Sequence, residues 1–122
     1  MVRSLLIDDI RNIKPMMGET IEVCRTFDKG MVALMGNAWD CLYLDHDLAD
    51  PDPRKTGYDV LCWLEANPVY LPRFIYLVTQ NPVGRQKMST VLEKLQRQYG
   101  VRTGRPSSEL IGEKAEKKTP KQ

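Results

Sequence analysis

The segments SLLIDD (residues 4–9) and CLYLDHD (residues 41–47) decide the fold, because in each of them an apolar run stops abruptly at acidic residues. A short, fully apolar run is typical of a strand that is buried in a parallel sheet. In an open α/β sheet, ligands bind in the crevice outside the carboxyl ends of the strands. If these two strands are neighbours, four carboxylates and the only histidine of the chain meet at that crevice.

This concentration of acid predicts a cation site. Carboxylates that lie close together repel one another unless a positive charge lies among them. A divalent cation with oxygen ligands, Mg²⁺, supplies that charge. We expect Asp8, Asp9 and Asp45 to hold the ion directly or through water. The alternative for Asp8 is a structural role as a helix N-cap.

Length and composition predict a single domain in the cytoplasm. The chain has 122 residues, 42% of them hydrophobic, which is enough for one core. No apolar run reaches the roughly 20 residues of a membrane span, and residues 1–10 do not resemble a signal peptide. The three cysteines lie in apolar or amphipathic segments, which favours reduced thiols over a disulfide or a zinc site.

The net charge of +2 conceals an uneven distribution. Residues 1–83 have an excess of Asp and Glu, whereas residues 84–122 have an excess of Lys and Arg. The basic part could meet a phosphate-bearing partner, a small molecule or an RNA end, or it could be a solvated helix face and a tail. We expect a domain over residues 1–106 and a polar, basic tail over residues 107–122, partly disordered or forming a short helix.

Strands and amphipathic helices alternate along the chain. β-rich runs predict strands at residues 2–7, 20–26, 40–44, 74–78 and 101–103. N-caps predict helices that begin after Thr26 and Asn81, and a further helix is expected to open at Thr56-Gly57. The first of these helices is expected to bury Phe27, Met31, Leu34 and Met35. Proline and glycine between the first two strands leave room for only a turn, so the pattern predicts an α/β fold whose first helix is short or missing.

This layout resembles the receiver domain of bacterial response regulators. In that family an acidic pair ends the first strand, a phospho-accepting aspartate ends the third, and Ser or Thr ends the fourth. Those positions match Asp8-Asp9, Asp45 and Thr79 in this chain. The resemblance implies a flavodoxin-like, doubly wound parallel sheet of four or five strands in the order 2-1-3-4-5.

Four short strings are similar to a divergent branch of that family, the cyclic-phosphate-processing receiver-like domains. The strings are DDIR (8–11), LDHDL (44–48), TGYD (56–59) and NPVG (81–84), and Met88 follows the last of them. The resemblance covers residues 2–100. One position departs from the family: receiver domains have a lysine before a proline at the end of the fifth strand, whereas this chain has Arg105-Pro106, and the planar fork of arginine does not replace a point charge.

The predicted catalytic residues Asp45, His46 and Asp47 follow the third strand. Asp45 could attack phosphorus as a nucleophile or only bind the metal. His46 could protonate a leaving oxygen as a general acid, or could be hydrogen-bonded to a neighbouring carbonyl. If the strand continues, Asp47 points to the side opposite His46, where it could orient a metal-bound water or cap the loop.

The predicted phosphate-binding residues lie at the start of the last helix: Thr79, Asn81, Gly84 and Arg85. The amide groups of a helix N-terminus attract anions, and glycine allows the backbone to approach a ligand. Arg85 could clamp a phosphate oxygen with two hydrogen bonds, or could be a surface charge.

Further polar and aromatic residues have open roles. Arg11 could be the salt-bridge partner of the acidic pair, and Lys55 could reach over the site from its loop. Trp39 and Tyr58 are expected to be packing residues, although either could stack on a nucleobase at the rim.

The leading functional interpretation is an enzyme that uses Mg²⁺ to hydrolyse a cyclic phosphate, either the 2′,3′-cyclic end of RNA or a cyclic nucleotide. The enzyme class would be a metal-dependent phosphodiesterase or phosphoester hydrolase. The alternative is a receiver-like module without catalysis that binds a protein partner, for example a phage protein that acts on a host factor. A third interpretation is a phospho-accepting single-domain regulator.

Overall fold

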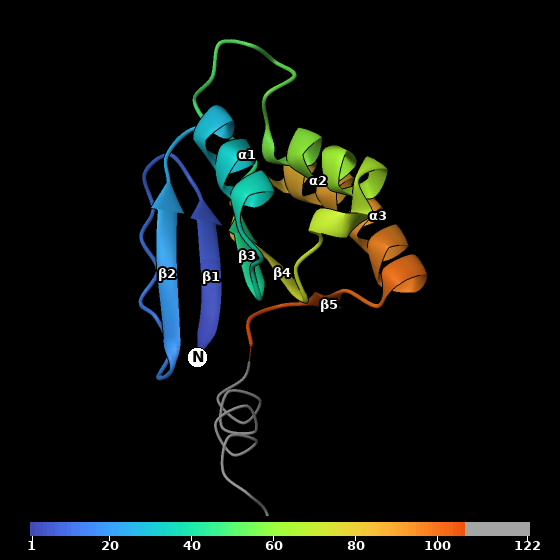
Figure 1. Cartoon of the computed structure of the whole chain (residues 1–122). Helices are drawn as coiled ribbons and strands as arrows, with labels where there is room; N and C mark the ends of the chain where they lie inside the picture. Colours follow the sequence, from blue (N-terminus) through green and yellow to red (C-terminus); the bar gives the residue numbers. More distant parts are fainter. Residues whose placement is uncertain (107–122) are drawn as a thin grey trace, which may run out of the picture.

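Five parallel strands form one sheet in the part of the chain that the computed structural model describes, residues 1–106. The strands are β1 (Val2–Ile7), β2 (Glu19–Cys24), β3 (Cys41–Leu44), β4 (Phe74–Leu77) and β5 (Arg102–Thr103). Their order in the sheet is β2-β1-β3-β4-β5, which confirms the predicted flavodoxin-like parallel sheet (Figure 1). The predicted basic tail at residues 107–122 lies outside the described residues.

The register of the sheet brings the carboxyl ends of its central strands to one level. Ile7 pairs with Leu44, and Leu44 pairs in turn with Leu77. The ladder continues one residue further, because the Asp45 amide donates to the Ile7 carbonyl over 3.0 Å. The residues that follow β1, β3 and β4 therefore leave the sheet at the same edge.

The first two helices begin where the sequence predicts, and Thr26 is the predicted N-cap of the first. The side chain of Thr26 accepts a backbone hydrogen bond at the start of α1 (Phe27–Gly36). Thr56 and Asp59 form a reciprocal capping box at the start of α2 (Gly57–Ala66). Both caps satisfy amide groups that have no partner within the helix.

The third helix also has a clear start and end signal in the sequence. A short 3₁₀ helix, η1 (Pro68–Tyr70), follows α2 and precedes β4. The side chain of Asn81 caps α3 (Pro82–Tyr99), which starts with proline at its first position. Gly100 ends the helix in the left-handed conformation with φ 71°, which glycine adopts without steric cost.

The three α-helices of the described chain pack against one face of the sheet (Figure 1). Their core positions include Met31, Leu34, Val60, Leu61, Leu64, Met88 and Leu95, which are all buried. The prediction for Met35 is wrong, because its side chain is 49% exposed and Ala33 is buried instead. Successive residues of a helix are rotated by about 100°, so Met35 lies beyond the edge of the buried stripe around Met31 and Leu34.

The opposite face of the sheet has no helix within residues 1–106. Residues 8–18, which connect β1 to β2, contain no helix, and this confirms that the first helix of the doubly wound pattern is missing. The apolar cluster on this face is small and consists of Leu6, Cys41, Tyr43 and Phe74. A hydrogen-bonded network around Glu19 adds to the contacts on this face.

The structure also tests the predictions for the cysteines and for membrane spans. Cys24, Cys41 and Cys62 are all free thiols, as predicted. Among the helices of residues 1–106, none has the length and apolar character that crossing a bilayer requires.

A buried carboxylate connects the strands of the second face. The Glu19 side chain is fully buried and accepts hydrogen bonds of 2.6 Å from the hydroxyls of Ser4 and Tyr43. It also accepts the Met16 amide over 2.9 Å and lies 3.4 Å from the Arg105 guanidinium. Burial alone raises the pKa of Glu19, but these hydrogen bonds and the arginine outweigh burial, so the pKa lies below its ordinary value.

We expect Glu19→Gln to be less stable than the wild type at pH 7 by about 1–3 kcal/mol, because the variant leaves Arg105 without its carboxylate. A carboxyl with a lowered pKa stabilises the folded protein above its unfolded pKa, near 4.5, and this contribution is lost as the pH falls through the folded pKa. Urea unfolding at pH 7 and at pH 3 measures both effects. The difference between the two proteins should be large at pH 7 and small at pH 3, and a constant difference would contradict this account.

Candidate functional site

Three carboxylates meet at the shared edge of β1 and β3. One oxygen each of Asp8, Asp9 and Asp45 lie within 4.8 Å of one another, and Asp8 and Asp45 are buried. The expectation that the ends of the first and third strands lie side by side is therefore met. These are the three residues that the sequence predicts as metal ligands.

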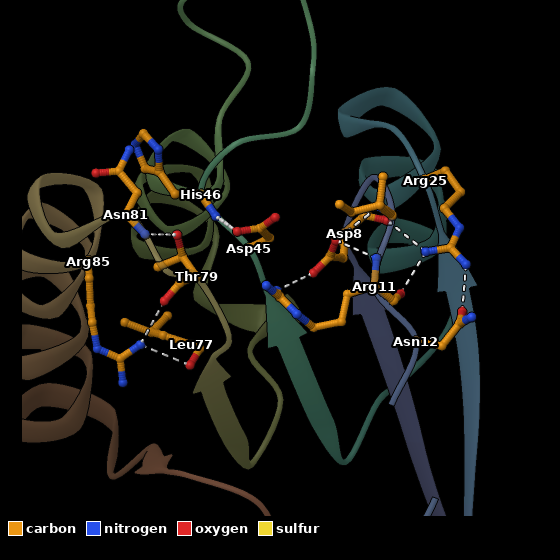
Figure 2. A network of polar contacts seen from close by, with 11 residues as sticks. Asp8, Arg11, Asn12, Arg25, Asp45, His46, Leu77, Thr79, Asn81 and Arg85 are labelled. Atoms are coloured by element: carbon orange, nitrogen blue, oxygen red, sulfur yellow. Dashed lines mark hydrogen bonds and ion pairs between the residues drawn. The ribbon is translucent and has the colours of Figure 1, made fainter. Parts of the chain in front are cut away.

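Asp8 is held by the loop that follows it (Figure 2). Its Oδ1 accepts the amides of Ile10 and Arg11 over 3.0 and 2.9 Å, and its Oδ2 accepts Arg11 Nη1 over 2.6 Å. Arg25 supports the same loop by donating to the Arg11 carbonyl over 2.6 Å. The alternative role for Asp8, a helix N-cap, is wrong, because no helix follows it within residues 8–18. Asp8 accepts loop amides instead, and Arg11 is its salt-bridge partner.

Asp45 occupies a more acidic environment. It is 8% exposed, and its Oδ1 accepts the His46 amide over 2.8 Å. Burial and then the charge of Asp8 raise the pKa of Asp45, although the His46 amide, the Thr79 hydroxyl and the Arg11 guanidinium act in the opposite direction. Burial and the charge of Asp8 together outweigh the groups that favour the ionised form of Asp45.

His46 and Asp47, which directly follow Asp45, form a hydrogen-bonded pair at the start of α3. His46 Nδ1 lies 2.9 Å from Asp47 Oδ1, and Asn81 Nδ2 lies 3.4 Å from Asp47 Oδ2. The hydrogen bond to His46 lowers the pKa of Asp47, whose side chain is exposed. An ionised Asp47 favours the proton on Nδ1 and leaves Nε2 as the second functional nitrogen of the ring.

The expectation that Asp47 points away from His46 is wrong. It assumed a continuing strand, but β3 ends at Leu44, so the alternation of a strand does not apply. The alternative for His46, a hydrogen bond to a neighbouring carbonyl, is also not what the ring does, since its partner is a carboxylate.

Two glycines let helices approach this loop closely. A Cβ atom on Gly57 would lie 2.0 Å from the Asp45 carbonyl oxygen, and the Gly57 amide donates to the His46 carbonyl over 2.9 Å. A Cβ atom on Gly84 would lie 2.4 Å from Cγ of the His46 ring. The sequence predicts that Gly84 lets a ligand approach the backbone, whereas in the structure Gly84 makes room for the His46 ring. The role of Gly57 was not predicted, although Gly57 lies in the string TGYD (56–59).

The predicted phosphate-binding residues are only partly together. Asn81 Oδ1 already accepts the amides of Val83 and Gly84 over 3.1 Å, and Thr79 Oγ1 accepts the Asn81 amide over 3.1 Å. Arg85 points along β4 and away from Asn81 (Figure 2). The described chain therefore does not bring Arg85 and the start of α3 into one phosphate cradle.

The direction of Arg85 has a physical reason in the sheet. β5 pairs with only Phe74 and Ile75 of β4, which leaves later carbonyl groups of that strand without a ladder partner. Arg85 Nη1 donates to the carbonyls of Leu77 and Thr79 over 3.2 and 3.3 Å. The arginine satisfies acceptors that the short neighbouring strand does not reach.

The remaining candidates have structural partners. Trp39 is buried and donates to the Ala33 carbonyl over 2.9 Å, and Tyr58 lies under Lys87 at 4.6 Å, so both have contacts within the fold. Lys55 forms an ion pair with Asp28 over 3.0 Å. Arg105, the nearest match to the receiver lysine, contacts Tyr43 and Glu19 on the second face of the sheet.

The family comparison agrees with this geometry. The model of a family described as cyclic-phosphate processing receiver domain matches residues 3–94, which is more than half of the chain. The match contains the carboxylate cluster, the His46–Asp47 pair and the start of α3, and it ends before β5 and Arg105. No curated protein shows a significant match to the chain.

We expect Gly84→Ala to destabilise the protein by about 1–3 kcal/mol, because the new methyl group overlaps the His46 ring. Gly36→Ala in α1 is the matched control, since a Cβ atom there meets nothing within 4 Å and alanine favours the helix. Chemical denaturation of both variants measures the difference. Equal stability of the two variants would show that the ring and the helix are not in contact.

Proposed function

The chain belongs to the cyclic-phosphate processing receiver domain family, and on that premise we propose that it hydrolyses a cyclic phosphate ester with Mg²⁺ bound at Asp8, Asp9 and Asp45. The substrate class is a 2′,3′-cyclic RNA end or a cyclic nucleotide. The observation that carries the proposal is the direct sequence of Asp45, His46 and Asp47, which joins the carboxylate cluster to a histidine–carboxylate pair.

The donor set suits a hard cation. Three carboxylate oxygens within 4.8 Å match the oxygen ligands that Mg²⁺ prefers. The pKa of Asp45 is raised by burial and then by the charge of Asp8, and a cation among these groups would favour the ionised carboxylate. Each carboxylate oxygen has two lone pairs, so Asp8 can accept the hydrogen bonds of its loop and still offer an oxygen to an ion. When bound, Mg²⁺ would supply Lewis-acid stabilisation of charge on the phosphoryl oxygens.

The protein's own groups account for the proton transfers. In the hydrolysis, the oxygen of water forms a bond to phosphorus, and one ring P–O bond breaks. His46 gives the leaving oxygen a proton from Nε2, while Asp47 holds Nδ1 and stabilises the charged ring before the transfer. The proton released by water returns to His46 through solvent, and the product is a phosphate monoester. Asp45 serves in this scheme as a metal ligand.

Mg²⁺ should raise the midpoint of thermal unfolding of the wild type, because a ligand that binds only the folded state stabilises it. Asp45→Asn should unfold at a higher temperature than the wild type without the ion, since one member of the repelling group is neutral, and should gain nothing from Mg²⁺. Glu93→Gln, an exposed carboxylate on α3, is the control and should respond as the wild type does. An equal Mg²⁺ response in Asp45→Asn would contradict the proposed ligand set.

His46→Gln should lower kcat on oligonucleotides that end in a 2′,3′-cyclic phosphate by about 10²- to 10⁴-fold, because it removes the general acid. Asp47→Asn should cause a smaller loss, since it only weakens control of the ring. Retention of the Mg²⁺-dependent stabilisation in each variant shows that folding is intact. Turnover by His46→Gln at the wild-type rate, or no turnover by the wild type, would end the enzymatic interpretation.

A non-catalytic protein-binding module is the second candidate, and one observation favours it. Arg11 already brings a positive charge to Asp8 over 2.6 Å and also acts on Asp45, so part of the need for a cation is met within the chain. If the Arg11 guanidinium alone compensates the charge of the carboxylate cluster, the protein shows neither Mg²⁺-dependent stabilisation nor turnover.

A further inference from the structure

Three arginines line a cavity of about 320 Å³ beside the carboxylate cluster. They are Arg11 from the loop after β1, Arg85 from α3 and Arg105 from the segment after β5, and we call this cavity the arginine pocket. No acidic side chain lines it among the described residues. The three positions are far apart in the sequence, so only the folded chain brings them together.

Each guanidinium is held in place by other groups of the protein. Arg85 Nη1 donates to two carbonyls at the end of β4, and Arg11 Nη1 donates to Asp8 (Figure 2). Arg105 donates from Nε to the Tyr43 hydroxyl and from Nη2 to the Lys14 carbonyl, both over 3.0 Å. These contacts orient the three planar groups before any ligand binds, which reduces the entropy that binding costs.

The anchoring contacts leave donors unused. A guanidinium has five N–H groups. Within residues 1–106, Nε and Nη2 of Arg11 and of Arg85, and Nη1 of Arg105, have no protein acceptor. Arg85 also has no carboxylate partner in this part of the chain. Charged donors grouped around a cavity without an acid are suited to an oxyanion, and arginine forks match phosphate oxygens in pairs.

The rest of the wall adds an apolar component. Ile13 is half-buried and Tyr76 keeps 37% of its surface exposed, and both line the pocket together with Thr79. A free phosphate ion would leave this surface in water, whereas the base or sugar of a nucleotide would cover it. The aromatic ring therefore favours a nucleotide over inorganic phosphate.

We propose that the arginine pocket binds the phosphate group of a nucleotide. This site goes beyond the proposed hydrolysis and does not need a metal ion. It adjoins the carboxylate cluster through two residues, since Arg11 pairs with Asp8, and Thr79 is one of the groups that act on the pKa of Asp45. The pocket is distinct from the start of α3, where Asn81 already occupies the first amides.

Isothermal titration in low salt with EDTA tests the proposal with three probes: adenosine monophosphate, inorganic phosphate and adenosine. The wild type should bind the nucleotide more tightly than phosphate, and adenosine weakly or not at all. Arg85→Gln should bind the nucleotide about tenfold more weakly or worse, because it removes a charge-assisted contact. Arg85→Lys should be intermediate, since it keeps the charge without the fork.

Arg97→Gln is the matched control, because Arg97 lies on the same helix and outside the pocket. It should bind as the wild type does. Because EDTA removes Mg²⁺ from every sample, binding under these conditions separates this proposal from a failure of the proposed metal site. No nucleotide binding by the wild type in EDTA, or wild-type affinity in Arg85→Gln, would overturn the proposal. Equal affinity for phosphate and nucleotide would overturn the assignment to a nucleotide.

Discussion

The pairing of β1 with β3 is the constraint on which the rest of the site depends. Ile7 and Leu44 are neighbours in the ladder and are both fully buried, so the acids that follow them have little freedom to move apart. Burying each such side chain contributes about 1.5–3 kcal/mol, and several of them hold the two strand ends together. The free energy gained by burying these strand residues offsets the repulsion between the carboxylates. An electrostatically unfavourable cluster can therefore persist in the folded protein.

Two close backbone approaches support the loop after β3. Gly57 admits the carbonyl of Asp45 at the start of α2, and Gly84 admits the ring of His46 at the start of α3. Two helices are thereby set against consecutive residues of one loop. A general acid must be positioned within a fraction of an ångström to be effective, and a rigid support of this kind provides such positioning.

The two faces of the sheet are stabilised in different ways. One face is covered by three amphipathic helices and has an apolar core. The other has a small apolar cluster and a hydrogen-bonded network around Glu19, to which Arg105 is attached. Arg11, Arg85 and Arg105 bond to carbonyls, a hydroxyl and carboxylates of the fold, and these contacts hold their guanidinium groups around one cavity. The same contacts that complete the fold therefore prepare a surface for an anion.

The sequence by itself determined the elements and their caps, the parallel order of the strands, and the acids at the strand ends. Thr26, Thr56 and Asn81 cap helices because the signals for a helix start lie within a few residues of one another. Only the tertiary structure decided the partners of the long side chains. Arg85 turns to β4 because β5 is short, and Arg105 reaches Glu19, 86 positions earlier in the chain. A flexible side chain takes the strongest acceptor within reach, and which acceptor is within reach is a property of the folded chain.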